Sequence, residues 1–308
     1  MKCFHLWLRK RTLRLLSTVT LLVFCLSLIA WVIKTDESDT EFRDEFNTKE
    51  VNANHNLRTK LMHEYCGKTG KYMDDSQEKH LDLSNFIVLE KYKLVYCPVP
   101  KVSCTVWKNL LAKLDGLFLG RPTNYSQTYT KFMFVREPFE RLLSAYRDVF
   151  LGWWKRSADF WKSYRKRVRE YLVSSGRLGI NTSADNTTFE EFATYVVLKH
   201  RNGKDLQEHW RPMYDLCHPC YIQFDFIGHY ETLMDDAQFI LRKTNVDDKV
   251  QFPEWRPTDT NDLMQKYYSN LTLLRIAQLQ SVYKDDLELF GYTFPGVLQP
   301  VVDKLGGT

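Results

Sequence analysis

The stretch VPKVSCTVWKNLL (99–111) sets the start of the fold, because it joins an apolar run to a helical pattern. Pro100 and Lys101 end the run, and small residues lead into a helix that Thr105 is placed to cap. Backbone N–H groups at such a strand–loop–helix junction point at anions, and Lys101 would add a mobile charge. The loop lacks the Gly-x-x-x-x-Gly-Lys-Ser/Thr pattern of ATP-binding loops. It is either an anion site of another kind or an ordinary turn with a surface lysine.

A second strand–helix unit, FVREPFERLLSAYRD (134–148), repeats the same arrangement. Arg136 ends the strand, where open α/β sheets place their ligand contacts, and Ser144 lies in the following helix. A planar guanidinium and a hydroxyl together suit a phosphate group. The alternative is a surface salt-bridge cluster of Arg136, Glu137 and Arg141, with Ser144 as a small helix residue.

Strand and helix patterns alternate along the chain, which predicts an α/β fold with a largely parallel central sheet flanked by helices. The predicted strands are 85–90, 93–99, 131–135 and 221–228. The predicted helices are 105–115, one beginning at Pro138, 187–200, 231–243 and 272–290.

The N-terminus predicts a single transmembrane helix before this fold. Residues 15–33 carry no charge and are long enough to span a bilayer, with basic residues before them and acidic residues after. A cleaved signal peptide is the alternative. The predicted organisation is a cytosolic tail (1–14), a signal anchor (15–33), a luminal stem (34–80) and a luminal domain (81–308).

Sequons and cysteines agree with a luminal body. The candidate glycosylation sites are Asn124, Asn181, Asn186 and Asn270. The cysteines beyond the anchor are odd in number, so at least one stays free or pairs between chains: Cys66, Cys97, Cys104, Cys217 and Cys220.

The pair Cys217 and Cys220 admits a local disulfide, a redox motif or half a zinc site. The structural bridge is preferred, and no metal is expected, because no second Cys/His pair stands at zinc-finger spacing. The net charge of +5 favours acidic ligands only weakly.

The two anion motifs carry a resemblance. PKVSCTVWK (100–108) followed by FVREPFERLLSAYRD (134–148) resembles the motifs by which Golgi carbohydrate sulfotransferases bind 3′-phosphoadenosine 5′-phosphosulfate (PAPS). The most similar branch contains the chondroitin, dermatan and related 4-O-sulfotransferases. The resemblance continues through 209–233 and 282–292, and it implies a P-loop-like sulfotransferase fold.

The resemblance implies roles for the motif residues. The first motif would hold the 5′-phosphosulfate, through Pro100, Lys101, Val102, Ser103, Cys104, Thr105, Val106, Trp107 and Lys108. Arg136 and Ser144 would hold the 3′-phosphate, and Lys101 would also be catalytic. Trp107 is expected to pack the helix against the core or to border the donor. Ser103, Val106 and Asn109 depart from the family pattern, which commonly has a small apolar residue, asparagine and arginine there.

An attacking hydroxyl needs a general base, and His209 is the candidate, with Glu208 and Glu231 in reserve. The basic and aromatic stretch 153–171 is expected to line a groove for an acidic glycan through Lys155, Arg156 and Arg165. The alternative for this stretch is a solvated amphipathic helix. A luminal location argues against nucleic acid as its ligand.

The sequence therefore predicts a Golgi type II membrane enzyme that transfers sulfate from PAPS to a glycan hydroxyl, on a chondroitin-type or another GalNAc- or uronate-containing chain. A luminal kinase is disfavoured by the absent Gly-Lys-Ser/Thr loop. An inactive glycan-binding protein of the same fold is the other alternative. Acceptor and oligomeric state stay open, a homodimer included.

Overall fold

The computed structural model describes residues 49–72, 81–114, 117–119, 128–152, 158–179, 187–254 and 260–306 of the chain. Residues 54–308 form one compact unit, and the chain up to Ala53 forms another. The expected anchor, 15–33, lies outside the described residues. Among the residues that are described, no helix is both long and apolar enough to cross a membrane.

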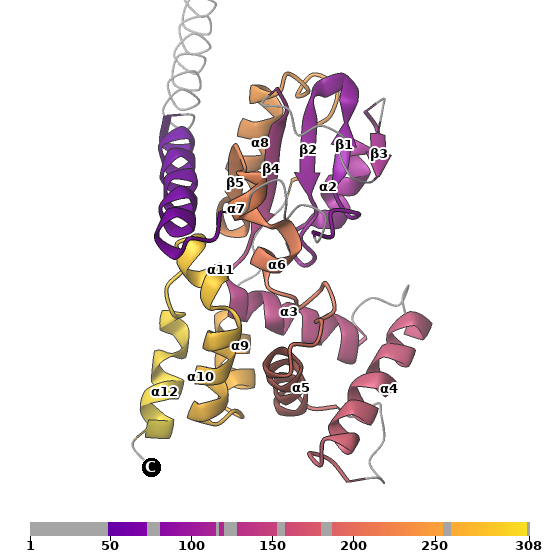
Figure 1. Ribbon diagram of the computed structural model, residues 1–308, viewed down its shortest axis with the longest axis vertical. Helices are drawn as coiled ribbons and strands as arrows, with labels where there is room; N and C mark the ends of the chain where they lie inside the picture. The colour runs from indigo at the N-terminus through magenta and orange to yellow at the C-terminus, as the bar shows by residue number, and fades with distance from the viewer. Residues whose placement is uncertain are drawn as a thin grey trace, which may run out of the picture. The chain divides into compact units, whose positions relative to one another are not determined.

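A five-stranded sheet forms the framework of the larger unit (Figure 1), in the order β3-β1-β2-β4-β5. Strands β2 (Leu94–Cys97), β4 (Thr130–Val135) and β5 (Phe226–His229) run parallel. Strands β1 (Ile87–Leu89) and β3 (Leu117–Leu119) add an antiparallel edge.

The prediction of a largely parallel sheet is therefore wrong, and the sheet is mixed. Only the 3₁₀ turn Glu90–Tyr92 and Lys93 separate β1 from β2. A connection this short can only reverse the chain, since parallel neighbours need a crossover of a dozen or more residues.

Helices cover the sheet and also build a separate helical core. Sheet residues pack with α2 (Cys104–Leu111) and α8 (Leu233–Lys243) in one hydrophobic cluster. The second cluster joins α3 (Pro138–Phe150), α4 (Ala158–Ser174) and α5 (Phe189–Arg201) to the C-terminal helices. The remaining helices are α6 (Met213–Cys217), α7 (Pro219–Ile222), α9 (Asn261–Tyr268), α10 (Leu273–Val282), α11 (Lys284–Leu289) and α12 (Gln299–Gly306), with 3₁₀ turns at Tyr230–Thr232 and Gly296–Leu298.

Two sequence-based assignments need correction in detail. The predicted strand 221–228 begins only at Phe226, because the proline-initiated α7 occupies its first residues. The predicted helix 272–290 is two helices that meet at Tyr283, whose hydroxyl donates to the Trp210 carbonyl (2.8 Å).

The local Cys217–Cys220 disulfide is not formed. Cys217 pairs with Cys97 at the end of β2, and Cys220 pairs with Cys66. His218, between the two cysteines, has a left-handed backbone (φ 47°), and the chain turns there from α6 into α7. Cys104 is unpaired, in agreement with the odd number of cysteines.

Residues 54–69 are helical and belong to the same unit as the body, although the sequence places them in the stem. Arg58 is buried there and donates to the Asp236 carboxylate (2.7 Å) and to the Ile227 carbonyl (3.2 Å). A buried charge needs its partner, so the Arg58 contacts fix the helix against β5 and α8, and the Cys66–Cys220 bridge fixes it to α7.

Candidate functional site

The carboxyl ends of the three parallel strands bring separate parts of the sequence together. The loop containing Lys101 follows β2, Arg136 follows β4, and Tyr230 follows β5. Parallel strands end at one edge of a sheet, so the two predicted anion motifs become neighbours there. The contact between them is direct, because Arg136 Nη1 donates to the Lys101 carbonyl (3.3 Å).

The loop itself has an uncommon backbone. Lys101 (φ 71°) and Ser103 (φ 54°) are both left-handed, and Val102 between them is not. Such a conformation is disfavoured by about 1–2 kcal/mol for a residue with a Cβ. Alternating backbone handedness turns successive N–H groups toward one point, which forms an anion-binding concavity.

The cap of the following helix differs from the prediction. Ser103, and not Thr105, is the N-cap residue of α2, and its side chain makes no capping bond. Thr105 lies in the first turn with its side chain exposed. Thr105 is therefore accessible at the end of the helix where the first N–H groups lack helical partners.

Two buried arginines from the second motif fix the loop. Arg141 Nε donates to the Pro100 carbonyl (3.0 Å), as Arg136 does to that of Lys101. In a trans peptide the C=O and the next N–H point in opposite directions. Holding both carbonyls on the arginine side thus directs the N–H groups of Lys101 and Val102 to the other side.

The surface-cluster alternative for these arginines is wrong. Arg136 is 5% exposed and Arg141 only 1%. Arg136 does pair with Glu140 (3.2 Å), and its guanidinium lies 4.0 Å from the centre of the Tyr230 ring. Glu140 also accepts from the Thr260 hydroxyl. The sequence analysis assigns no site role to Tyr230, for which the signals are its position directly after a parallel strand and its place in the resembling block 209–233.

The Lys101 ammonium is held by Asp148 on α3. Nζ lies 2.9 Å from Oδ2, and each side chain is 14% exposed. The other carboxylate oxygen, Oδ1, is buried and has no hydrogen-bond partner in the structure. The ammonium of the catalytic candidate Lys101 is therefore held against α3 by the Asp148 carboxylate, which the sequence analysis did not single out.

One face of α3 connects these groups. Glu140, Ser144, Arg147 and Asp148 form its partly exposed stripe, at helical spacing between buried neighbours. Ser144 lies between the Arg136 end and the Lys101 end of this stripe. Partial burial lowers the pKa of Arg147, and the nearby charge of Arg136 lowers it further. Two cations near each other with Ser144 on the same face favour an anionic ligand.

The other residues of the first motif contribute differently. Val102 and Trp107 are fully buried. The Trp107 ring packs against the rings of Phe132 and Phe134, with distances between ring centres of 5.3 Å and 5.0 Å. Of the two expectations for Trp107, core packing is the one observed. Lys108 is exposed on α2.

His209 lies in the turn 207–211, and Arg141 joins this turn to the loop. The Arg141 guanidinium donates to the Glu208 carbonyl (2.8 Å) and to the Arg211 carbonyl (2.7 Å). His209 Nδ1 lies 3.0 Å from Gln207 Oε1, which also accepts from the His209 backbone N–H (2.7 Å). A carbonyl oxygen only accepts, so Nδ1 carries the proton and Nε2 keeps a lone pair.

The electrostatics of this position keep His209 neutral. Burial and, to a smaller extent, the charges of Lys101, Arg141 and Lys108 together lower its pKa to about 3. The ring also meets the edge of Trp161 on α4, with ring centres 4.9 Å apart. The imidazole is thus close enough to the anion loop to respond to its charges.

The two reserve bases are differently placed. Glu208 is half exposed, and its carboxylate lies 3.7 Å from His209 Nδ1. Glu231 accepts from the Glu137 N–H (3.1 Å) and from the Tyr292 hydroxyl (3.0 Å). Burial raises the pKa of Glu231, and its two hydrogen bonds suit a structural role.

The predicted acceptor and modification residues are only partly described. Lys155 and Arg156 lie outside the described residues, as do Asn124, Asn181 and Asn186. Arg165 donates to the Val149 carbonyl (2.7 Å) near the end of α3. Asn270 is exposed. No group of three or more potential metal ligands occurs within the described ranges.

Replacing His209 with glutamine should change how stability depends on pH. The folded histidine has a pKa of about 3 and the unfolded one 6.5, so the unfolded chain binds more protons between these values. From pH 7 to pH 5 the wild type should lose about 2 kcal/mol of unfolding free energy that His209→Gln keeps. Urea titrations of both proteins at the two pH values measure this, and parallel pH dependences would contradict the burial of a neutral imidazole.

Comparisons with known proteins agree with this geometry. A family model described as the sulfotransferase family matches residues 84–293. Carbohydrate sulfotransferase 11 from Danio rerio is 37% identical over 253 residues, which cover 71% of this chain and 70% of the relative. Carbohydrate sulfotransferase 14 from Homo sapiens is 32% identical over 284 residues, covering 80% and 72%. No solved structure matches the chain.

The matched range contains the anion loop, the two arginines that fix it and the turn of His209. The resemblance drawn from the two motifs is thereby confirmed at the level of the family. The chain belongs to the sulfotransferase family and is a sulfotransferase enzyme.

Proposed function

We propose that this enzyme transfers the sulfuryl group of PAPS to a hydroxyl of a glycan, on a chondroitin-type or another GalNAc- or uronate-containing chain. The observation that carries the proposal is the pair of buried arginines, Arg136 and Arg141, which bind two carbonyls of the loop. The N–H groups of Lys101 and Val102 therefore point to the side of the loop opposite the arginines. The names of the relatives, carbohydrate sulfotransferases, support a glycan as acceptor.

The residues present fit the two ends of PAPS. The loop N–H groups, the start of α2 and the Lys101 ammonium suit the 5′-phosphosulfate. Arg136 and Ser144 suit the 3′-phosphate, and Arg147 is a further cation on the same face of α3. The proposal includes no metal, because these cations and backbone dipoles supply the charge stabilisation.

In the proposed reaction the acceptor oxygen forms a bond to sulfur while the bond from sulfur to the bridging phosphate oxygen breaks. The electron pair of that bond stays with adenosine 3′,5′-bisphosphate, and Lys101 neutralises the charge that develops there. The hydroxyl proton passes to His209 Nε2. The positive charges of Lys101 and Arg141 help to lower the pKa of His209. A bound anionic donor offsets these charges, so the imidazole becomes a stronger base once the donor is bound.

The proposed location is the Golgi membrane, with residues 15–33 as a type II anchor and the enzyme domain in the lumen. The disulfides Cys66–Cys220 and Cys97–Cys217 support an oxidising compartment. Asn270 is exposed at the end of α9, as a glycosylation site must be.

The test is to incubate the full-length enzyme with radiolabelled PAPS and desulfated chondroitin, dermatan, heparosan or N-glycans. Label is expected in one polymer, and adenosine 3′,5′-bisphosphate should compete with PAPS. Binding of PAPS without transfer to any acceptor would instead indicate a glycan-binding protein. Failure to bind PAPS would overturn the assignment of both anion motifs.

A further inference from the structure

Tyr230 is placed beside Arg136 by the register of the sheet. Val135 of β4 and His229 of β5 are partners in the parallel ladder. The residues that follow them, Arg136 and Tyr230, therefore leave the sheet side by side. The Tyr230 ring is partly buried, and the buried guanidinium of Arg136 lies 4.0 Å from its centre. A cation this close to an aromatic ring, and this little hydrated, is strongly attracted to it.

Hydrogen bonds beyond this pair fix the backbone that carries the ring. The next residues are Glu137 and Glu231, and the Glu137 N–H donates to the Glu231 carboxylate (3.1 Å). Thr232, in the same 3₁₀ turn as Tyr230, donates from its hydroxyl to the Asp236 carboxylate (2.7 Å). The ring is therefore in place before any ligand binds.

The guanidinium of Arg136 is partly committed to the protein. Its Nε donates to Glu140 Oε2 (3.2 Å), and its Nη1 donates to the Lys101 carbonyl (3.3 Å). The other oxygen of Glu140 accepts from the Thr260 hydroxyl. Among the described residues, none makes a hydrogen bond to Nη2. With two nitrogens bonded and the ring against it, the guanidinium is held so that Nη2 can donate to a ligand.

We infer that Tyr230 sets the preference of the enzyme for nucleotides that carry a 3′-phosphate. It is a positioning residue, which acts by holding the guanidinium of Arg136 in place. The inference rests on the proposed function, in which Arg136 binds the 3′-phosphate of PAPS. An arginine side chain that is free to rotate loses this freedom when it binds, and the ring removes that cost beforehand.

The other role open to a tyrosine ring at a nucleotide site is stacking on the base. Stacking on adenine would favour adenine nucleotides with and without the 3′-phosphate equally. The contact with Arg136 favours only the nucleotide that has this phosphate. The observed contact is with the guanidinium, and a comparison of the two kinds of nucleotide separates the two roles.

The test measures, by calorimetry on the full-length protein, the binding of adenosine 3′,5′-bisphosphate and of adenosine 5′-phosphate. Tyr230→Leu should weaken binding of the bisphosphate about tenfold, because the contact it removes is with a desolvated cation. It should leave the affinity for adenosine 5′-phosphate within about twofold of wild type, since this ligand does not engage Arg136. Tyr230→Phe keeps the ring and should bind both nucleotides as wild type does.

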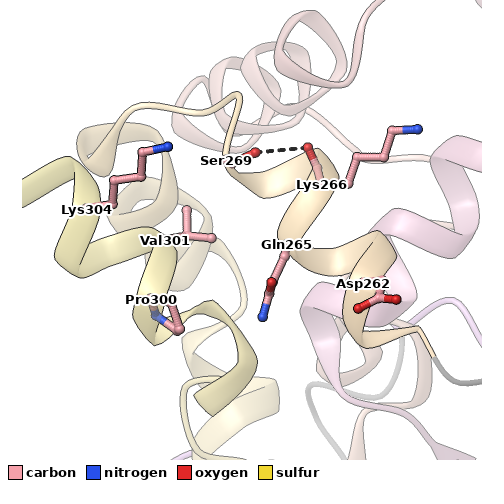
Figure 2. Close-up of a pocket in the computed structure, with 7 residues that line it drawn as sticks. All are labelled: Asp262, Gln265, Lys266, Ser269, Pro300, Val301 and Lys304. Atoms are coloured by element: carbon pink, nitrogen blue, oxygen red, sulfur yellow. Dashed lines mark hydrogen bonds between the residues drawn. The ribbon is translucent and has the colours of Figure 1, made fainter.

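Two control variants separate this effect from a general one. Tyr129→Leu removes a tyrosine whose ring centre lies 4.8 Å from the Lys93 ammonium, at the other end of β4. Lys266→Ala/Lys304→Ala removes two ammonium groups from a cavity of about 440 Å³ between α9 and α12 (Figure 2), a second place where a phosphate could bind. Both variants should leave the two affinities unchanged, which assigns the measured binding to the site of Arg136.

The inference is overturned if Tyr230→Leu keeps the wild-type preference for the bisphosphate or weakens both nucleotides equally, as loss of base stacking would. It is also overturned if Tyr230→Phe behaves like Tyr230→Leu, or if the Lys266/Lys304 variant abolishes the preference. Wild-type protein that binds both nucleotides equally would overturn it together with the role of Arg136.

Binding does not require turnover, so failure of the proposed function is seen separately. A preference for the bisphosphate that depends on Tyr230, without sulfate transfer to any glycan, would refute the proposed reaction and leave this inference standing. Sulfate transfer from PAPS by an enzyme whose preference Tyr230→Leu does not change would do the reverse.

Discussion

Replacing Lys101 with alanine is expected to lower kcat for sulfate transfer by about 10³-fold. A single donor aimed at developing negative charge in a preorganised site is worth about 10²–10³ in rate, and Lys101 contributes a full charge in a largely buried position. Arg136 and the loop N–H groups remain, so binding of adenosine 3′,5′-bisphosphate should weaken by only about tenfold. Single-turnover transfer of labelled sulfate and equilibrium binding measure the two effects separately.

The alanine variant also leaves Asp148 without its cation, which could destabilise the fold for a separate reason. The double variant Lys101→Ala/Asp148→Ala removes both charges and should regain thermal stability while staying as slow as Lys101→Ala. Lys266→Ala, on an exposed face of α9, controls for the loss of a lysine elsewhere and should keep wild-type kcat. A Lys101 variant that melts normally and turns over within threefold of wild type would refute its catalytic role.

The predictable part of this site depends on short-range signals. Pro100 lies shortly after one strand and Pro138 begins one helix, and the apolar spacing around them shows which segments are buried. These features predict two strand–helix units whose loops carry Lys101 and Arg136. The short connection between β1 and β2 can only join antiparallel strands, so the antiparallel part of the sheet also follows from local spacing.

The rest depends on contacts between distant parts of the chain. The cysteine pairs span 154 and 120 residues, and no local spacing distinguishes them from a bridge between Cys217 and Cys220. Arg141 lies 41 to 70 residues from the carbonyls it binds, so from sequence it resembles any charged residue on a helix. Its burial follows only from how the loop and the turn of His209 meet.

Replacing Arg141 with methionine should have the largest effect on the fold. The methionine fills similar space, but three carbonyls, the buried one of Pro100 and the partly buried ones of Glu208 and Arg211, lose their donor. Unsatisfied buried groups cost about 1–3 kcal/mol each, so the unfolding free energy should fall by about 3–5 kcal/mol. In a domain of this size the melting temperature should fall by roughly 10 °C, as differential scanning calorimetry would show.

The same substitution should affect catalysis in protein that is still folded. Arg141 fixes the loop that is proposed to hold the donor and the turn that carries the proposed base, so its loss frees both. At a temperature where the variant is folded, the donor KM should rise and kcat should fall together, by about tenfold each, because positioning losses of this kind affect both.

Arg141→Lys keeps a charge but cannot reach three carbonyls from one ammonium, and it should recover only part of the stability. Arg167→Met, on the exposed face of α4, removes a guanidinium that contacts Tyr164 and should shift stability by about 0.5 kcal/mol or less. An Arg141→Met protein as stable and active as Arg167→Met would show that loop and turn hold their places without the buried guanidinium.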